Sequence, residues 1–380
     1  MLGSLCLYAG CSGQLIFLKQ YLPTLTCHDD LNYLCFRQNK KCPSSLQVCC
    51  AIQNTEKLMQ DSIENHHGTP DEQAYNTDKM MQLVSSSVDL DKCGWTNIQP
   101  STSPDKRDQQ SSGQAGQAGQ ASYQEFRWMV AIMKKRRGVT VWVPDDFLAG
   151  GSLIHPSVVI TAAYHVNQYR NRELKVRAGE FNIQTENEAY KFEEQDVNKK
   201  IIHPEYFRPS LYYNVALVFL KHPFNLDAAP HIGLACLNKA LPEPGTECFT
   251  MGWGKLPTEQ RYATTLKKSK LPLVSPEVCE TNLRTTLLGR YFKLHSSLTC
   301  AGGQEGEDAC YKDGGGPLVC PIQFQEDGAN VRYAMVGIVA YGIGCGVKDR
   351  PGVYVNVPAI YAWVDKVMTE EKYGTFTYTV

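Results

Sequence analysis

The chain has 380 residues, with 38 lysine and arginine residues against 39 aspartate and glutamate residues and a formal net charge of −1. This balance excludes the strong electrostatic attraction on which most nucleic-acid and anionic-membrane binding depends. The length exceeds a usual single domain of roughly 100 to 200 residues, and no apolar run is long enough for a membrane-spanning helix. Fifteen cysteines are too many for idle thiols in a reducing cytosol. We therefore expect a secreted, extracellular protein with no nucleic-acid partner and no membrane span.

The N-terminal half divides by composition. Residues 1–26 contain a stretch, Met1–Gln14, with no basic residue and several glycines, so we interpret them as an N-terminal segment with a defective or missing signal region. Residues 51–121 are polar and end in a Gln-Ala-Gly repeat, too poor in apolar surface to form a core. We expect a flexible linker, stapled through Cys93 and open to proteolysis at Lys106-Arg107.

From Phe126 onward, short apolar runs rich in β-branched residues alternate with turn residues, which predicts strands. The runs are Trp128–Met133, Ser152–Ala162, Val215–Leu220, Cys248–Trp253, Tyr333–Tyr341 and Gly352–Val357. Only Pro358–Met368 has apolar residues at helical spacing. We predict an all-β domain over residues 122–368 that closes with one helix, and a C-terminal tail over residues 369–380.

Several landmarks of this domain, in the same order, resemble those of the chymotrypsin-like serine proteases. They are Gly150–Ile154, Val159–Ala163, Asn214–Leu217, Gly252–Gly254, Cys310–Pro317 and Pro351–Tyr354. The resemblance implies a double β-barrel with a C-terminal helix. It also implies four disulfides: Cys93–Cys236, Cys248–Cys320, Cys279–Cys300 and Cys310–Cys345. The family's bridge beside the catalytic histidine is absent, because Ala149 and His165 stand at its two positions.

The earlier cysteines resemble a clip domain, the small disulfide knot that precedes arthropod proteases of this kind. Cys27, Cys35 and Cys42 lead to the tandem Cys49-Cys50, so we place the clip-like domain at residues 27–50. A clip needs six cysteines, and Cys6 or Cys11 would supply the first. The alternative is a cysteine-rich segment produced by a faulty start.

The catalytic positions of the family carry other residues here. Acyl transfer on this fold needs a serine nucleophile, a histidine base and an aspartate that orients the histidine. The resemblance places Tyr164 at the base, Asn214 at the aspartate and Gly314 at the nucleophile. A phenol is a poor proton acceptor at neutral pH, an amide carries no charge, and glycine has no side chain. The triad is therefore degenerate at all three positions.

The surroundings of these positions have changed too. Lys312 replaces the glycine of the oxyanion site, and no serine or threonine occurs between Ala301 and Ile322. No Arg-Ile or Arg-Val junction precedes the domain. Asp313 therefore lacks the N-terminal ammonium group that, in active family members, pairs with this aspartate and orders the active site. We expect either that Asp313 binds another cation or that the pocket keeps a zymogen-like arrangement. We interpret His165 as a packed histidine beside Ala149, with a functional histidine as the alternative.

Two binding sites remain candidates. Asp308 stands where trypsin-like members select arginine or lysine, with Tyr341, Gly342 and Gly352 lining the pocket; a collapsed pocket is the alternative. An acidic loop resembles the family's calcium loop. Its candidate calcium ligands are Glu180, Asn182, Glu186 and Glu188. The alternative is an acidic, solvated hairpin that binds no calcium. The basic run Lys134–Arg137 is typical of a solvated loop tip, with a protein-docking exosite as the alternative.

Together these features resemble the clip-domain serine protease homologues of arthropod haemolymph, which include masquerade-like proteins and prophenoloxidase-activating cofactors. The resemblance implies a non-catalytic adaptor for prophenoloxidase and an activating clip-domain protease, with self-association after cleavage of the linker. Two alternatives stay open. One is a decoy that binds arginine- or lysine-bearing substrates or inhibitors, and the other is a residual serine-type endopeptidase with relocated catalytic groups.

Overall fold

A computed structural model describes residues 93–96, 119–136, 146–185, 188–255, 262–324 and 331–380, together with the backbone of four short strands before residue 52. The chain divides into two compact units, Met1–Asp91 and Lys92–Val380. The pairing of the clip-like cysteines, most of the linker, the Lys106-Arg107 site and Glu186 lie outside the described residues, so the expectations about them stay predictions.

The first unit contains two small antiparallel pairs of strands. β1 (Ser4–Leu5) pairs with β2 (Thr26–Cys27), and β3 (Tyr33–Phe36) pairs with β4 (Val48–Ala51). The second pair sets the backbone of Cys35 opposite that of Cys49, within the stretch predicted to be clip-like.

The second unit begins with a closed, six-stranded antiparallel barrel in the order β10-β7-β6-β5-β8-β9. Its strands are β5 (Met129–Lys134), β6 (Phe147–His155), β7 (Val158–Thr161), β8 (Leu174–Ala178), β9 (Glu193–Ile202) and β10 (Ala216–Leu220). The run Ser152–Ala162, predicted as one strand, holds the end of β6 and all of β7, separated by a two-residue turn. A core of fully buried aliphatic side chains such as Val130, Leu153 and Val218 fills this barrel.

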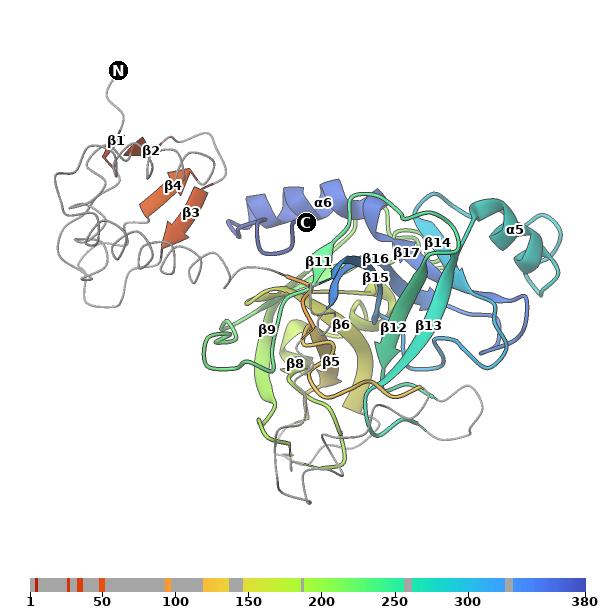
Figure 1. Cartoon of the computed structure of the whole chain (residues 1–380), viewed down its shortest axis with the longest axis horizontal. Helices are drawn as coiled ribbons and strands as arrows, with labels where there is room; N and C mark the ends of the chain where they lie inside the picture. Colours follow the sequence, from red (N-terminus) through yellow and green to blue (C-terminus); the bar gives the residue numbers. More distant parts are fainter. Residues whose placement is uncertain are drawn as a thin grey trace, which may run out of the picture. The chain divides into compact units, whose positions relative to one another are not determined.

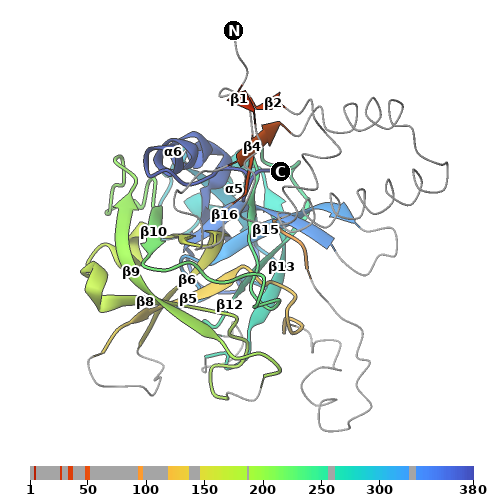
Figure 2. The same cartoon turned by 90° about the vertical axis from the view of Figure 1, so that its left-hand side faces the viewer.

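A second six-stranded antiparallel barrel follows, closed by the pairing of β16 with β17. Its strands are β12 (Glu247–Gly252), β13 (Lys267–Val274), β14 (Leu298–Gly302), β15 (Pro317–Phe324), β16 (Val331–Tyr341) and β17 (Pro351–Asn356), and a short β11 (Cys236–Leu237) runs parallel to β16. Figures 1 and 2 show the two barrels side by side, with β5, β6, β8 and β9 on one side and β12, β13, β15 and β16 on the other. The predicted double barrel is confirmed.

The helices correct the prediction of a single helix. The predicted C-terminal helix is present as α6 (Val357–Glu370), but α5 (Pro276–Arg284) was not expected, nor were the short α4 (Ala163–Val166) and 3-10 helix η4 (Asn171–Glu173). Ser275 caps α5 by accepting a hydrogen bond from the Val278 N–H, with Pro276 at the first helical position. None of the helices in the described part of the chain is long and apolar enough to cross a membrane.

One strand of the first barrel, β9, is too polar to show the usual alternation. β9 contains one fully buried residue, Val197, among charged and half-buried ones. It pairs with β8 and β10 and thereby closes the barrel. Cross-strand pairing and ion pairs hold β9 in place, which local propensity could not predict.

Four disulfides bind the second unit: Cys93–Cys236, Cys248–Cys320, Cys279–Cys300 and Cys310–Cys345. They are the four pairs that the family resemblance implies. The first one fixes the linker at Cys93, and the adjacent backbone of Gly94 also pairs with the second unit. The Gly94 N–H donates to the Leu234 carbonyl at 2.7 Å, and the Gly94 carbonyl accepts from the Tyr333 N–H at 2.8 Å.

The C-terminal tail is part of the folded unit. Tyr378 is fully buried, and its hydroxyl donates to Asp365 at 2.7 Å. Its carbonyl accepts from the Leu237 N–H, and the neighbouring Thr377 hydroxyl donates to the Ile154 carbonyl, both at 2.8 Å. Residues 369–380 therefore join the start of the second barrel to β6 of the first.

We expect Tyr378→Ala to lower the free energy of unfolding by about 3 to 4 kcal/mol, because it empties a fully buried aromatic site. Val380→Ala is the matched control, since Val380 is 56% exposed and its truncation should change stability by about 0.5 kcal/mol or less. Denaturant titration of both variants measures the difference, and equal stabilities would show that the tail is not part of the core.

Candidate functional site

The segment Cys310–Pro317 lies at the junction of the two barrels. The Gly314 carbonyl accepts from the Gly150 N–H of β6 at 3.0 Å, and the Gly315 N–H donates to the Val339 carbonyl of β16 at 2.9 Å. Gly315 has φ 83°, and a Cβ there would lie 2.4 Å from the Thr161 hydroxyl. The segment is therefore held by both barrels at close backbone approach.

His165 occupies the space that a side chain at position 314 would need. A Cβ built on Gly314 would lie 2.1 Å from His165 Nε2, closer than real Cβ contacts. The ring therefore lies against Gly314, a contact that the sequence analysis did not predict. Burial lowers the pKa of His165 to about 4, so the imidazole is neutral at physiological pH.

Tyr164 and Asn214 lie next to this contact but do not form a proton relay. The Tyr164 ring is 42% exposed and meets His165 edge to face at 5.2 Å between ring centroids. Asn214 is fully buried, and its Oδ1 accepts from the Tyr164 backbone N–H at 2.8 Å. Its Nδ2 has no hydrogen-bond partner among the described residues. The hydrogen bond from the Tyr164 backbone to Asn214 holds the two positions together. Asn214 carries no charge, and Tyr164 is not a base at neutral pH.

Hydroxyl groups near the site are engaged elsewhere. Thr161 is fully buried and donates to the Gly150 carbonyl at 2.7 Å. Ser297 lies 2.9 Å from His295 Nδ1, an arrangement that could suggest a relocated nucleophile. Ser297 is fully buried and accepts from the Tyr213 backbone N–H at 3.1 Å. Neither hydroxyl is presented to a substrate.

Lys312, at the former oxyanion position, retains a backbone that suits glycine. Its φ is 70°, a left-handed conformation that costs a non-glycine residue roughly 1 to 2 kcal/mol. Its ammonium lies 4.9 Å from the centre of the Tyr262 ring. The local chain path therefore persists although the residue has changed.

Asp313 has a cation partner that the sequence analysis left open. Lys267 Nζ of β13 donates to Asp313 Oδ2 at 2.5 Å, and both side chains are at least 95% buried. Asp313 also accepts backbone N–H bonds from Gly254 and Cys310, each at 2.8 Å. An ammonium from within the chain thus neutralises the carboxylate that active family members pair with a new N-terminus.

This pairing explains the glycines of the Gly252-Trp253-Gly254 motif. A Cβ on Gly252 or Gly254 would lie within 2.5 Å of an Asp313 carboxylate atom. A sequence signal for Lys267 did exist: it lies two residues before Ser269 and four before Leu271, on the buried face of an alternating strand. A lysine on a buried face requires an acidic partner.

A family model described as Trypsin matches residues 115–364. The chain belongs to the trypsin family. Within this trypsin family, phenoloxidase-activating factor 2 of Galleria mellonella is 46% identical over 252 residues, covering 64% of this chain and 80% of that protein. Inactive CLIP domain-containing serine protease A3 of Aedes aegypti is 39% identical over 252 residues, covering 65% of this chain and 50% of that protein. Inactive CLIP domain-containing serine protease A8 of Anopheles gambiae is 36% identical over 249 residues, covering 64% of each chain.

These comparisons relate this trypsin-family chain to clip-domain proteases. Two of the three relatives carry the word inactive in their names, and the third is named for phenoloxidase activation. The stretch that the family model matches, residues 115–364, lies within the second unit.

The pocket around Asp308 keeps a buried carboxyl group. Asp308 is 3% exposed, and its Oδ2 accepts from the Gly346 N–H at 3.1 Å. Its Oδ1 has no partner in the described part of the chain and faces Gly352, where an added Cβ would lie 3.1 Å away. Burial raises the pKa of Asp308 to about 7. Tyr341 pairs with Val353 in the neighbouring strand, and burial raises its pKa to about 12.

The predicted calcium ligands are used in internal contacts. Glu180 is buried and accepts from Arg177 Nη1 at 2.8 Å, Glu188 accepts from the Asn182 N–H, and Asn182 Oδ1 accepts from the Gln184 N–H. Among the described residues, no group of three or more His, Cys, Asp or Glu side chains could hold a metal ion. Arg177 already supplies a positive charge to Glu180, and the other described candidates, Asn182 and Glu188, accept hydrogen bonds from backbone N–H groups. Calcium binding stays a prediction, and Glu186 lies outside the described residues.

We expect Gly314→Ser to leave hydrolysis at background and to lower stability by about 1 kcal/mol, because the new Cβ displaces the His165 ring. In the His165→Ala background, Gly314→Ser should lower the free energy of unfolding by less. A double-mutant cycle by denaturant unfolding measures this coupling. Additive effects would show that His165 does not fill the space at position 314.

Lys267→Met should lower the free energy of unfolding by about 3 to 5 kcal/mol, because it leaves the buried Asp313 carboxylate without its cation. Adding Asp313→Asn should restore part of that loss. The matched control is Lys270→Met on the same strand, whose side chain is 54% exposed, with an expected change of about 1 kcal/mol or less. Equal losses for Lys267→Met and Lys270→Met would contradict the assigned role.

Asp308→Asn should stabilise the protein at pH 8 by up to about 4 kcal/mol. The unfolded carboxyl loses its proton near pH 4 and the folded one near pH 7, so wild-type stability falls as pH rises between these values. Unfolding titrations from pH 4 to 8 should therefore show a gap between variant and wild type that opens with pH. A gap that does not depend on pH would contradict the burial of this carboxyl.

Proposed function

We propose that this chain is a non-hydrolytic member of the trypsin family that acts as an adaptor or cofactor in an extracellular proteolytic cascade of the phenoloxidase-activating kind. The observation that carries the proposal is the contact between Gly314 and His165. The nucleophile position has no side chain, and a neutral imidazole occupies the space where one would stand. A chain with this contact cannot form an acyl-enzyme at that position.

The preserved scaffold supports a binding role. Both barrels, four disulfides and the buried partner of Asp313 are present, so the surface loops are held in place although the catalytic groups are not. The disulfides support an extracellular location. Phenoloxidase-activating factor 2 of Galleria mellonella is similar over the same region, which supports prophenoloxidase and an activating clip-domain protease as partners. Self-association after cleavage at Lys106-Arg107 is part of this proposal.

A second candidate function is that of a decoy for arginine- or lysine-bearing segments, and one observation favours it. Asp308 keeps an unpartnered, buried Oδ1 beside Gly352, where a guanidinium or ammonium group could bind. A decoy would capture arginine- or lysine-bearing segments without cutting them. The decoy hypothesis predicts that p-aminobenzamidine, a cationic ligand of this pocket, binds to the wild type and that Asp308→Asn abolishes this binding. An adaptor without an open pocket would not bind this ligand.

The purified full chain should not hydrolyse an arginyl ester or amide above the rate in buffer, with an active trypsin as the positive control. A serine-directed phosphonate should add no mass to it. In a second assay, the chain should raise the phenoloxidase activity obtained from prophenoloxidase and an activating clip-domain protease. Stoichiometric labelling that blocks ester turnover would refute the non-hydrolytic proposal.

The adaptor part is tested with the same three proteins. Omitting the chain, or replacing it with an unrelated disulfide-bonded protein, should give the lower phenoloxidase yield. An unchanged yield, together with no co-sedimentation with either partner before or after linker cleavage, would refute the adaptor role while leaving the absence of hydrolysis intact.

A further inference from the structure

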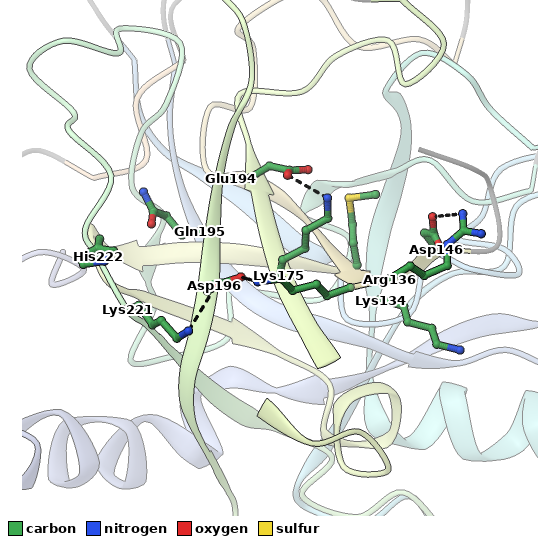
Figure 3. A pocket seen from close by; sticks show the side chains of 11 residues that line it. Lys134, Arg136, Asp146, Lys175, Glu194, Gln195, Asp196, Lys221 and His222 are labelled. Carbon is green, nitrogen blue, oxygen red and sulfur yellow. Dashed lines mark hydrogen bonds and ion pairs between the residues drawn. The ribbon is translucent and has the colours of Figure 1, made fainter. Parts of the chain in front are cut away.

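A polar hollow of about 470 Å³ opens at one end of the first barrel. Its walls come from the end of β5, from Asp146 just before β6, from β8 and β9, and from the segment that follows β10 (Figure 3). It shares no residue with the degenerate triad or with the Asp308 pocket. Its volume falls within the range of roughly 300 to 1,000 Å³ that is usual for ligand pockets.

The side chains that line this hollow carry a surplus of positive charge. Five lysine and arginine residues stand against three carboxylates: Lys134, Lys135, Arg136, Lys175 and Lys221 against Asp146, Glu194 and Asp196. The whole chain has a formal charge of −1, so the surplus is local. It includes most of the basic run Lys134–Arg137 that the sequence analysis singled out.

Asp196 lies between two lysines at the centre of this arrangement. It accepts from Lys135 at 2.5 Å and from Lys221 at 3.2 Å, and the hydrogen bond from Lys135 lowers its pKa. Two ammonium groups thus share one carboxylate, and each has three donors. A second carboxylate from outside could bind the donors that Asp196 does not use.

The other two carboxylates are also committed. Glu194 accepts from Lys175 at 2.8 Å and from Arg177 at 2.9 Å, and Arg136 donates to Asp146 at 2.5 Å (Figure 3). Lys134 forms no ion pair within the described part of the chain. The charge left without a partner is therefore positive.

The arrangement is held by strands. Glu194 and Asp196 are two residues apart on β9 and so point to the same face, and Lys175 of β8 lies directly opposite Asp196. Met133 of β5 lies beneath the hollow and is only 1% exposed, so a ligand would meet mainly charged and polar side chains. A site of this kind suits a carboxylate.

We propose that this hollow binds an acidic peptide segment of a partner protein through aspartate or glutamate side chains. The five cations line one hollow of about 470 Å³ and are interspersed with three carboxylates, whereas a sulfated polysaccharide is usually bound by a longer basic track. The biological use of this binding rests on the proposed adaptor function, whereas the binding itself does not.

The test measures fluorescence anisotropy of a labelled hexapeptide, Gly-Glu-Asp-Glu-Asp-Gly, titrated with the full-length protein. The matched peptide Gly-Gln-Asn-Gln-Asn-Gly is the control for charge. The acidic peptide should bind at least about tenfold more tightly than the amide peptide at low ionic strength, and the difference should shrink at physiological salt.

Matched variants locate the site. Lys134→Gln/Lys221→Gln should weaken binding of the acidic peptide about tenfold, because each substitution removes one surface charge contact. Lys293→Gln/Lys348→Gln removes two exposed lysines outside the hollow and should change it by less than about twofold. Thermal midpoints of both variants control for folding, and the single Lys134→Gln variant, which breaks no internal ion pair, should still weaken binding.

Equal weakening of acidic-peptide binding by the two double variants would overturn the proposal. A second contradicting result would be that heparin binds through Lys134 and Lys221 while the acidic peptide does not bind. This outcome is independent of the adaptor assay. A chain that binds the peptide and yet fails to assist phenoloxidase formation would refute the proposed function alone.

Discussion

The buried ion pair between Lys267 and Asp313 is the interaction on which the arrangement of the site depends. Asp313 is adjacent to Gly314, is only 2% exposed, and accepts two backbone N–H bonds that fix the turn before it. A buried carboxylate in this position needs a cation. Active members of the family obtain that cation from a newly cut N-terminus. Here β13 supplies it from within the chain, so the turn can be ordered without cleavage.

The contact between His165 and Gly314 is the second interaction that shapes this segment. The first interaction keeps the segment Cys310–Pro317 in place, and the second fills the space of its missing side chain. Serine at position 314 would clash with the His165 ring, and Asn214 offers no charge to support a base. The scaffold therefore retains loops and hollows that can bind a partner, while the groups that would carry out acyl transfer are absent from their positions.

The sequence predicted those parts of the fold that leave a local or motif signature. Apolar runs such as Val215–Leu220 became buried strands, and the family landmarks predicted the double barrel and the four disulfides. The roles assigned to the triad positions stay predictions. The polar strand β9 and the helix α5 were not predicted, since the first is held by cross-strand ion pairs and the second buries only Cys279 and Leu283.

Contacts between residues that are far apart in the sequence could not be predicted either, because no local pattern encodes them. Lys267 and Asp313 are 46 residues apart, and no spacing rule connects them. The position of the His165 ring depends on a rotamer and on the absence of a side chain at Gly314. The hollow beside Asp196 draws its lining from five segments, of which the sequence analysis singled out only the basic run that begins at Lys134. The docking of residues 369–380 likewise depends on the burial of one side chain, Tyr378.

Hydrogen exchange of the backbone amides in Cys310–Gly316 tests the central claim most directly. The account predicts slow exchange of these amides in the uncleaved full chain, no change when the linker is cut, and rapid exchange in the Lys267→Met variant at temperatures where the barrels remain folded. Rapid exchange in the uncleaved wild type that becomes slow only after proteolysis would show that order in this segment comes from a new N-terminus, and would contradict the account.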